Sequence, residues 1–278
     1  MIELVRTEDG SLSRFDEETG ELYHNRAGAY TEALRNYYEA SDANDRLQRT
    51  GELRLLDACF GLGYNTFVLL AELVNAGCKG KIVVHAVETD AQILSAIPQV
   101  LGDDRLQTVA QSFIGAELAG FGSFQLSTGE LNVCIDVIEQ DLRLFARDLR
   151  GTYDVVFHDP FSPRKVPELW IVDIFVKYYQ ALAPGRGRVL TYSSAGAVRG
   201  GLREAGFKIF RTAALGGKTG GTLATTDGTY LAQAPVDSLS DEEVKRLYTA
   251  SSVPFRDPAF RQSRHDILQR RAQEQASR

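Results

Sequence analysis

The sequence has few cysteines and no long apolar run. These two absences argue against a disulfide-rich or cysteine-rich zinc protein and against a membrane-spanning protein. Its three cysteines, Cys59, Cys78 and Cys134, are odd in number and lack Cys-x-x-Cys spacing. They therefore predict neither a disulfide framework nor a cysteine-rich zinc site. No stretch of about 18 apolar residues occurs, and the start of the chain has no signal-peptide pattern. We expect a reduced, cytoplasmic protein that binds no metal and does not enter a membrane.

The composition is that of an ordinary globular protein of 278 residues, with 44% hydrophobic and 24% charged residues. Its formal net charge of -6 is unevenly distributed, because residues 186–218 contain seven basic residues and a single acid, Glu204. This basic segment is either a solvated face or a surface that binds a polyanion. In the second case Arg199, Arg203 and Lys218 are candidate contacts to a nucleic-acid substrate.

Alternating strand and helix patterns predict a doubly wound α/β sheet. Strands are expected at 53–59, 81–88, 153–158 and 188–192, helices at 66–76, 91–100, 170–182 and 198–205, an inserted β-hairpin at 124–126 and 131–138, and closing strands at 208–213 and 222–226. An N-terminal extension over residues 1–50, with one helix at 31–40, precedes the main domain at 51–235. A charged tail over 236–278 follows, and Ser240 and Glu243 have capping-box spacing there.

Two glycines and an acid follow the first two predicted strands, where ligands bind in open α/β sheets. Gly61 and Gly63 allow the backbone to approach a ligand closely, although a tight turn alone would also use them. Glu88 can accept hydrogen bonds from the two hydroxyls of a ribose. Thr66 occupies the place of the third glycine of the dinucleotide fingerprint. A nucleoside ligand without a pyrophosphate therefore fits better than a nicotinamide or flavin dinucleotide.

Two more acidic residues, Asp141 and Asp159, follow later predicted strands. Asp141 can accept a hydrogen bond from an adenine amino group or cap the following helix, and one Asp can do both. Asp159 precedes a loop with three prolines in eight residues, which hold the loop rigid. A carboxylate in this position suits holding an amine while a carbon is delivered to it. The alternative is a rigid loop without a chemical role.

These motifs, taken together and in this order, resemble the MnmC-like methyltransferase family. The segments that carry the resemblance are 57–65, 87–88, the hairpin ending at 141, 158–163 with Trp170 downstream, 192–202 and 205–207. The resemblance covers residues 23–226 and is specific through the combination of motifs. It implies a Rossmann-like class I S-adenosylmethionine-dependent enzyme that completes 5-methylaminomethyl-uridine at the wobble position of certain tRNAs.

The resemblance also implies roles for individual residues. Loop 60–65 and Glu88 would hold the methionine and ribose parts of the cofactor, Asp141 would lie near its adenine, and Asp159 would lie at the methyl-transfer site. The residues assigned to the cofactor are Phe60, Gly61, Gly63, Asn65, Glu88, Asp141 and Asp159. Bifunctional members of the family carry an additional flavin-dependent domain. Since this sequence stops at Arg278, we expect the stand-alone form, with other tRNA-modifying enzymes supplying the aminomethyl precursor.

The expected reaction is methyl transfer to the primary amine of an aminomethyl group on a wobble uridine in a tRNA anticodon loop. Asp159 would orient the amine and receive its proton, without a metal. Phe161 is a candidate catalytic residue and stacking platform for the splayed-out base, whereas Trp170 fits the helix core better. Alternatives are an aminopropyltransferase or other small-amine methyltransferase on the same fold, and a catalytically silent RNA-binding module.

Overall fold

The computed structural model describes residues 2–113, 119–213, 220–227 and 236–277. A nine-stranded sheet with the order β13-β11-β12-β10-β9-β5-β6-β8-β7 runs through the described part of the chain. Its strands are β5 (Glu52–Ala58), β6 (Lys79–Glu88), β7 (Gly122–Thr128), β8 (Glu130–Glu139), β9 (Val155–His158), β10 (Arg188–Thr191), β11 (Lys208–Thr212), β12 (Thr222–Thr225) and β13 (Val236–Ser238). The sheet is thus mixed: β10, β9, β5, β6 and β8 form the parallel centre that the alternating pattern predicts, and the outer strands pair antiparallel.

The strand order creates a switch point in the middle of the sheet. From β5 the chain adds β6 and β8 on one side, and then returns to add β9 and β10 on the other, all in parallel. Strand β12 then inserts antiparallel between β10 and β11. The carboxyl ends of β5, β6 and β9 therefore meet at one edge, where open α/β sheets bind ligands.

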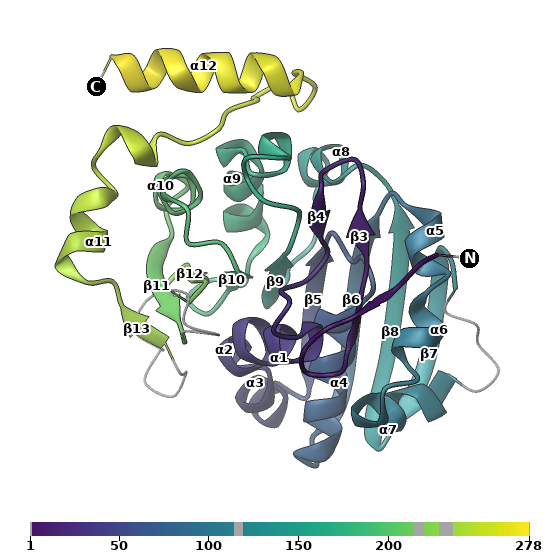
Figure 1. Ribbon diagram of the computed structural model, residues 1–278. Helices are drawn as coiled ribbons and strands as arrows, with labels where there is room; N and C mark the ends of the chain where they lie inside the picture. The colour runs from purple at the N-terminus through teal and green to yellow at the C-terminus, as the bar shows by residue number, and fades with distance from the viewer. Residues whose placement is uncertain (1, 114–118, 214–219, 228–235, 278) are drawn as a thin grey trace.

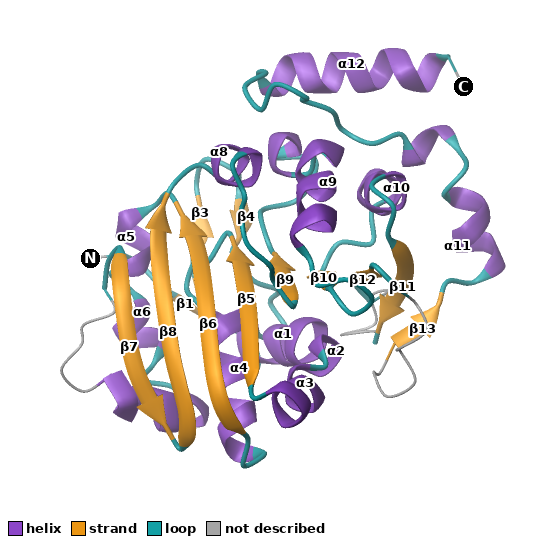
Figure 2. Cartoon of the chain, turned by 180° about the vertical axis from the view of Figure 1, so that it is seen from behind, coloured by secondary structure: helices purple, strands orange, loops and turns teal. Residues whose placement is uncertain are grey.

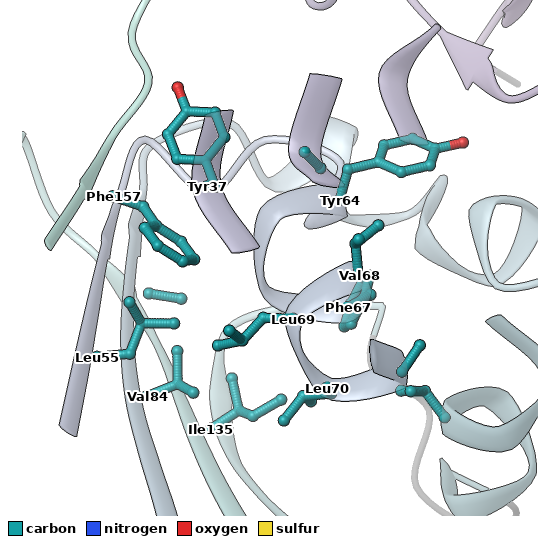
Figure 3. Packing of buried hydrophobic residues seen from close by; sticks show 14 of the residues in the cluster. Tyr37, Leu55, Tyr64, Phe67, Val68, Leu69, Leu70, Val84, Ile135 and Phe157 are labelled. Atoms are coloured by element: carbon teal, nitrogen blue, oxygen red, sulfur yellow. The ribbon is translucent and has the colours of Figure 1, made fainter. Parts of the chain in front are cut away.

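Helices cover both faces of the sheet (Figures 1 and 2). One face carries α1 (Ala29–Ala33), α2 (Glu39–Ser41), α3 (Ala43–Thr50), α4 (Tyr64–Asn75), α5 (Ala91–Leu94), α6 (Ile97–Val100) and α7 (Gln107–Ala110). The other carries α8 (Leu142–Arg147), α9 (Val172–Ala181) and α10 (Gly196–Glu204). Figure 3 shows the first core, in which Leu69 and Leu70 of α4 lie against Leu55, Val84 and Ile135 of the sheet. The helices on both faces hold the sheet, and the carboxyl ends of β5, β6 and β9, where the site lies, in a fixed arrangement.

Most expected elements occur close to their predicted bounds, but the hairpin, the helix at 31–40 and the N-terminal extension differ. In addition, the helix expected at 91–100 is divided into α5 and α6, and the tail contributes β13 to the sheet. The predicted hairpin exists as β7 and β8, and β8 is the parallel neighbour of β6, so the hairpin extends the sheet. The single helix expected at 31–40 is interrupted by a π-helical turn at Leu34–Tyr38. The N-terminal extension also contains four short strands that the sequence did not indicate: β1 (Val5–Arg6), β2 (Leu12–Ser13), β3 (Phe15–Asp16) and β4 (Glu21–Leu22).

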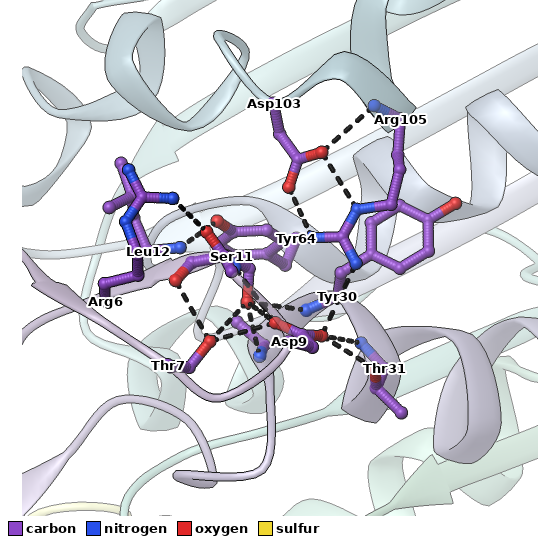
Figure 4. Close-up of polar contacts among 12 residues, drawn as sticks. Arg6, Thr7, Asp9, Ser11, Leu12, Tyr30, Thr31, Tyr64, Asp103 and Arg105 are labelled. Carbon is purple, nitrogen blue, oxygen red and sulfur yellow. Dashed lines mark hydrogen bonds and ion pairs between the residues drawn. The ribbon is translucent and has the colours of Figure 1, made fainter.

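A partly buried carboxylate, that of Asp9, fastens the start of the chain to the domain (Figure 4). Asp9 accepts hydrogen bonds from the amides and hydroxyls of Ser11 and Thr31. Burial alone would raise the pKa of Asp9, but these hydrogen bonds outweigh it and hold the pKa well below its ordinary value. Gly28 is required beside it, since a Cβ there would lie 2.0 Å from the carboxylate. The N-terminal strands are therefore a fixed part of the fold.

The C-terminal segment packs on the second face of the sheet. It contains α11 (Asp241–Arg246), with the predicted capping box between Ser240 and Glu243, and α12 (Arg264–Ala276). Ile267 of α12 is fully buried in the second core, and Arg256 bonds to Glu204 of α10. Among the described residues, no helix is both long and apolar enough to span a membrane.

Candidate active site

Three strand ends are joined by backbone hydrogen bonds at the switch point. The amide of Asp159, after β9, donates to the carbonyl of Ala58 at the end of β5 over 3.2 Å. The amide of Phe60, in the next loop, donates to the carbonyl of Val87 in β6 over 3.0 Å. The segments that the sequence singled out as Gly61-x-Gly63, Glu88 and Asp159 are therefore brought together.

The loop after β5 turns sharply through two glycines with positive φ, 55° at Gly61 and 77° at Gly63. A Cβ at Gly63 would lie 2.4 Å from the ring of Phe67, so this glycine serves the packing of the loop against α4. The side chain of Phe60 is buried and meets Phe67 edge to face. The side chain of Phe60 is therefore part of the core, and a cofactor contact by Phe60 stays a prediction.

Glu88 holds this loop in place. One carboxylate oxygen accepts a hydrogen bond of 2.8 Å from the amide of Gly61, and the other accepts from the amides of Thr89 and Asp90. The acid and the glycine loop thus form one connected cradle at the ends of β5 and β6. Ribose recognition by Glu88 stays a prediction.

Asp159 lies in a polar cluster that the sequence revealed only in part. The side-chain amide of Asn65 donates to it over 2.7 Å, and the hydroxyl of Tyr37 donates to it as well. Burial raises the pKa of Asp159 to about 6, against the lowering effect of these two hydrogen bonds. The backbone amide of Tyr192 donates to the Tyr37 hydroxyl over 3.3 Å. Asp159 is therefore an oriented acid that changes charge near neutral pH.

Tyr37 is the residue that sequence reasoning missed at this cluster. It lies in the π-helical turn of the N-terminal segment and is fully buried. Such turns are frequent at functional sites, but the sequence carries no signal for this one.

The proline-rich loop after Asp159 is fixed from two sides. The indole N–H of Trp170 donates to the carbonyl of Phe161 over 2.8 Å, and the Tyr192 hydroxyl donates to the carbonyl of Pro160 over 3.0 Å. Trp170 is fully buried, so its predicted place in the core is confirmed. The ring of Phe161 remains partly exposed beside Asp159 and is one aromatic surface available to a ligand.

An open pocket of about 850 Å³ lies beside Asp159. Phe161, Ser162 and Tyr192 form one side of it, and residues 5–8 and 20–26 of the N-terminal extension form much of the other. The extension, for which the sequence offered no site residue, is therefore a wall of the candidate active site.

Asp141 caps α8. Its side chain accepts a hydrogen bond of 2.7 Å from the amide of Arg143 and also pairs with the Arg143 guanidinium. The helix-cap interpretation is confirmed, and a contact with adenine stays a prediction.

The basic segment at 186–218 is largely neutralised by acids from outside it. The ion pairs are Arg188 with Asp42, Arg199 with Glu243, Lys208 with Asp227, and Arg211 with Asp237 and Glu243. Lys218 lies outside the described residues. The charge sum over the segment alone overstated the positive surface, because it omitted partners far away in the sequence.

Arg199 requires a correction. The sequence suggested a surface contact to RNA, but the side chain is buried and its guanidinium bonds to Glu243, Thr222 and the carbonyl of Gly221. Burial alone would raise the pKa of Glu243, yet hydrogen bonds from Arg199 and Ser240 outweigh this and hold the pKa at about 2. Arg199 therefore acts as a structural tie between α10, β12 and α11.

We predict that Arg199→Ala lowers the free energy of unfolding by about 3 kcal/mol, because it leaves Glu243 without its buried partner. Denaturant titration would measure this loss. The matched control is Arg246→Ala, which removes an exposed pair with Glu242 and should change stability by about 0.5 kcal/mol or less. Unchanged stability, with weakened RNA binding, would restore the surface interpretation.

Arg203 is partly buried at the end of α10. Its guanidinium lies 4.3 Å from the ring centre of Tyr248, which is 68% exposed. A contact between Arg203 and RNA stays a prediction.

The comparisons with known proteins agree with this geometry. A family model described as S-adenosyl-L-methionine-dependent methyltransferase matches residues 104–227. The crystal structure of MnmC2 from Aquifex aeolicus superposes with a TM-score of 0.81 and 26% identity, covering 99% of this chain and 84% of that one. The chain is thus similar over nearly its whole length to the MnmC-like methyltransferase family. S-adenosyl-L-methionine is the cofactor of this family, and the Rossmann-like class I fold expected from the sequence is confirmed.

Two curated relatives have similar sequence identity to this chain, and their matches cover different shares of each chain. The chain is 27% identical over 224 residues to the tRNA 5-methylaminomethyl-2-thiouridine biosynthesis bifunctional protein MnmC of Burkholderia vietnamiensis, covering 77% of this chain and 33% of that protein. It is 28% identical over 276 residues to an uncharacterized protein of Methanocaldococcus jannaschii, covering 96% of this chain and 71% of the other. The chain thus spans about a third of the bifunctional relative.

The residues at the switch point fit S-adenosylmethionine. The Gly61 turn permits close approach of a ligand, and Glu88 offers carboxylate oxygens beside it. Asp57, which precedes the loop, has a buried oxygen with no hydrogen-bond partner among the described residues. Burial raises the pKa of Asp57 well above its ordinary value. We propose that loop 60–65 and Glu88 hold the cofactor.

We predict that Glu88→Ala weakens cofactor binding by about 1.5 to 3 kcal/mol, as expected for loss of a charge-assisted hydrogen bond. Calorimetric titration with S-adenosylhomocysteine would measure the effect. Glu139→Ala is the control, since Glu139 is exposed and pairs in register with Glu88 at the end of β8. Equal affinity in the two variants would remove Glu88 from the site.

Proposed function

We propose that the protein methylates the primary amine of an aminomethyl group on uridine at the wobble position of tRNA. The observation that carries the proposal is an ionisable carboxylate, Asp159, positioned by Tyr37 and Asn65 at the boundary between the glycine loop and an open pocket. The relationship to the bifunctional MnmC proteins, named for 5-methylaminomethyl-2-thiouridine biosynthesis in tRNA, supports this choice of acceptor. Such a substrate would place the reaction in the cytoplasm.

Asp159 has two tasks in this reaction. S-adenosylmethionine, when bound, supplies an electrophilic methyl group, so that an N–C bond forms as the S–C bond breaks and S-adenosylhomocysteine leaves. The acceptor amine must be neutral to react, and Asp159 would hold it by hydrogen bonding. As the nitrogen becomes positively charged, the carboxylate stabilises that charge and accepts a proton. Its pKa of about 6 lets it do so near neutral pH.

The pocket supplies surfaces for a base and its backbone. Phe161 and Phe15, the latter 50% exposed, are aromatic rings on which a splayed-out anticodon base can stack. Arg6 and Arg26 are exposed in the same lining. The pocket lining therefore offers both aromatic rings for a uridine base and positive charges for its phosphate backbone.

We predict that Tyr37→Phe moves the acid limb of the methyl-transfer rate to higher pH. The Tyr37 hydroxyl bonds to Asp159 and lowers its pKa, so removing it leaves the raising effect of burial less opposed. Single-turnover rates across pH would record the shift. Tyr38→Phe, on the same π-helical turn, is the control and should leave the profile unchanged. Identical profiles for all three proteins would contradict the positioning role of Tyr37.

Competition between acceptors tests the proposal against its alternatives. The protein is incubated with methyl-labelled S-adenosylmethionine and with tRNA bearing aminomethyl-uridine, tRNA lacking it, or a polyamine. We expect label only in the aminomethyl-bearing tRNA. Label in the polyamine would favour a small-amine methyltransferase, aminopropyl transfer from decarboxylated cofactor would favour an aminopropyltransferase, and tRNA binding without transfer would favour a silent RNA-binding module.

A further inference from the structure

Residues 12–23, called here the N-terminal arm, cross the edge of the sheet where the candidate cofactor site lies (Figure 1). Arg14 forms an ion pair of 3.0 Å with Asp90, two residues beyond Glu88 at the end of β6. At the other end of the arm, Glu21 accepts hydrogen bonds from the amide and hydroxyl of Ser162 in the loop after β9. The arm therefore bridges two strand ends that flank the glycine loop.

Tyr23 closes the arm over that loop. Its ring lies 3.3 Å from the position that a Cβ would occupy on Gly61, and it meets the ring of Phe161 edge to face at 4.9 Å. Burial raises the pKa of the Tyr23 hydroxyl well above its ordinary value, and the negative charges of Glu88 and Asp90 raise it further. The side chain is thus in contact with the residues proposed for cofactor binding and with the proposed stacking platform.

Tyr23 also marks a boundary. The open pocket is lined by Tyr23, Asp159 and Phe161, while neither Gly61 nor Glu88 belongs to its described lining. The acceptor side is accordingly open, and the cofactor side lies behind the arm.

We infer that the N-terminal arm is part of the cofactor site, that Tyr23 contacts the bound cofactor, and that the arm slows its release. This inference rests on the proposed cofactor site at Gly61 and Glu88. It does not depend on which acceptor receives the methyl group. A cofactor held under a wall with polar anchors at both ends leaves only when those anchors part, whereas the acceptor enters from the open pocket.

The test is the dissociation rate of S-adenosylhomocysteine from the full chain, measured by stopped-flow displacement with excess unlabelled ligand. We expect Tyr23→Ala to speed release by about tenfold or more, because an aromatic contact is lost. Tyr23→Phe, which keeps the ring, should stay within about threefold of the original rate. Glu21→Ala should also speed release, whereas Glu17→Ala removes an exposed acid from the same hairpin and should have no effect.

Hydrogen exchange gives a second measurement that does not require activity. S-adenosylhomocysteine should slow exchange of the amides at 12–23 in the original protein, and less so in Glu21→Ala. Circular dichroism would establish that each variant is folded. An unchanged release rate in folded Tyr23→Ala, or no ligand-dependent protection of the arm, would overturn the inference. No tRNA is present in either measurement, so failure here is separate from failure of the proposed acceptor.

Discussion

Asp159→Asn is expected to slow methyl transfer by about a hundredfold or more, a barrier increase of about 2.7 kcal/mol, while cofactor binding stays close to that of the original protein. The amide preserves the shape of the carboxylate and one acceptor oxygen. It removes the negative charge and the capacity to take a proton. The variant therefore separates placement of the amine from stabilisation of the charge that develops on it.

Single-turnover rates on pre-bound aminomethyl-tRNA would measure this effect. Since burial raises the pKa of Asp159 to about 6, the side chain is charged above that pH and neutral below it. The rate of the original protein should fall as pH decreases through about 6, and this contribution should be missing in Asp159→Asn. Asp148→Asn, which changes an exposed acid after α8, is the control. Turnover of Asp159→Asn at the original rate would leave the proline-rich loop as scaffold only.

Gly61→Val is expected to abolish cofactor binding in a protein that still folds. The backbone at Gly61 has φ of 55°, which a β-branched residue rarely adopts, and the new side chain would project toward the Tyr23 ring. Tyr23, which forms part of the proposed cofactor site, would then have to shift.

The matched control is Gly77→Val. Gly77 has a similar φ of 67° and no atom within 4 Å of the added Cβ position, so it carries the backbone strain without a neighbouring site. Calorimetry with S-adenosylhomocysteine should detect binding to Gly77→Val and none to Gly61→Val. Equal affinity in the two folded variants would exclude the loop from the cofactor site.

The sequence predicted the strand-end features well, for a physical reason. Gly61, Glu88 and Asp159 lie at or just beyond the carboxyl ends of β5, β6 and β9, and parallel strands align these ends at one edge. Once the strands are assigned, their terminal residues must lie close together. The strand pattern of the sequence was therefore enough to predict that these three residues lie close together.

Features that depend on contacts between distant segments could not be predicted in this way. Tyr37 reaches Asp159 from a π-helical turn that the sequence reads as ordinary helix. The N-terminal arm consists of two-residue strands, which are too short to show an alternating pattern. Arg199 looked like surface charge because its partner, Glu243, lies 44 residues further along the chain.

Nucleoside analysis of the product tests the central claim most directly. tRNA bearing 5-aminomethyl-uridine would be incubated with the protein and S-adenosylmethionine, digested to nucleosides and analysed by mass spectrometry with fragmentation. The account predicts that the wobble nucleoside gains one methyl group and that fragmentation places it on the aminomethyl nitrogen. A methyl group on the base, the ribose or another nucleotide, or no methylated nucleoside at all, would contradict it.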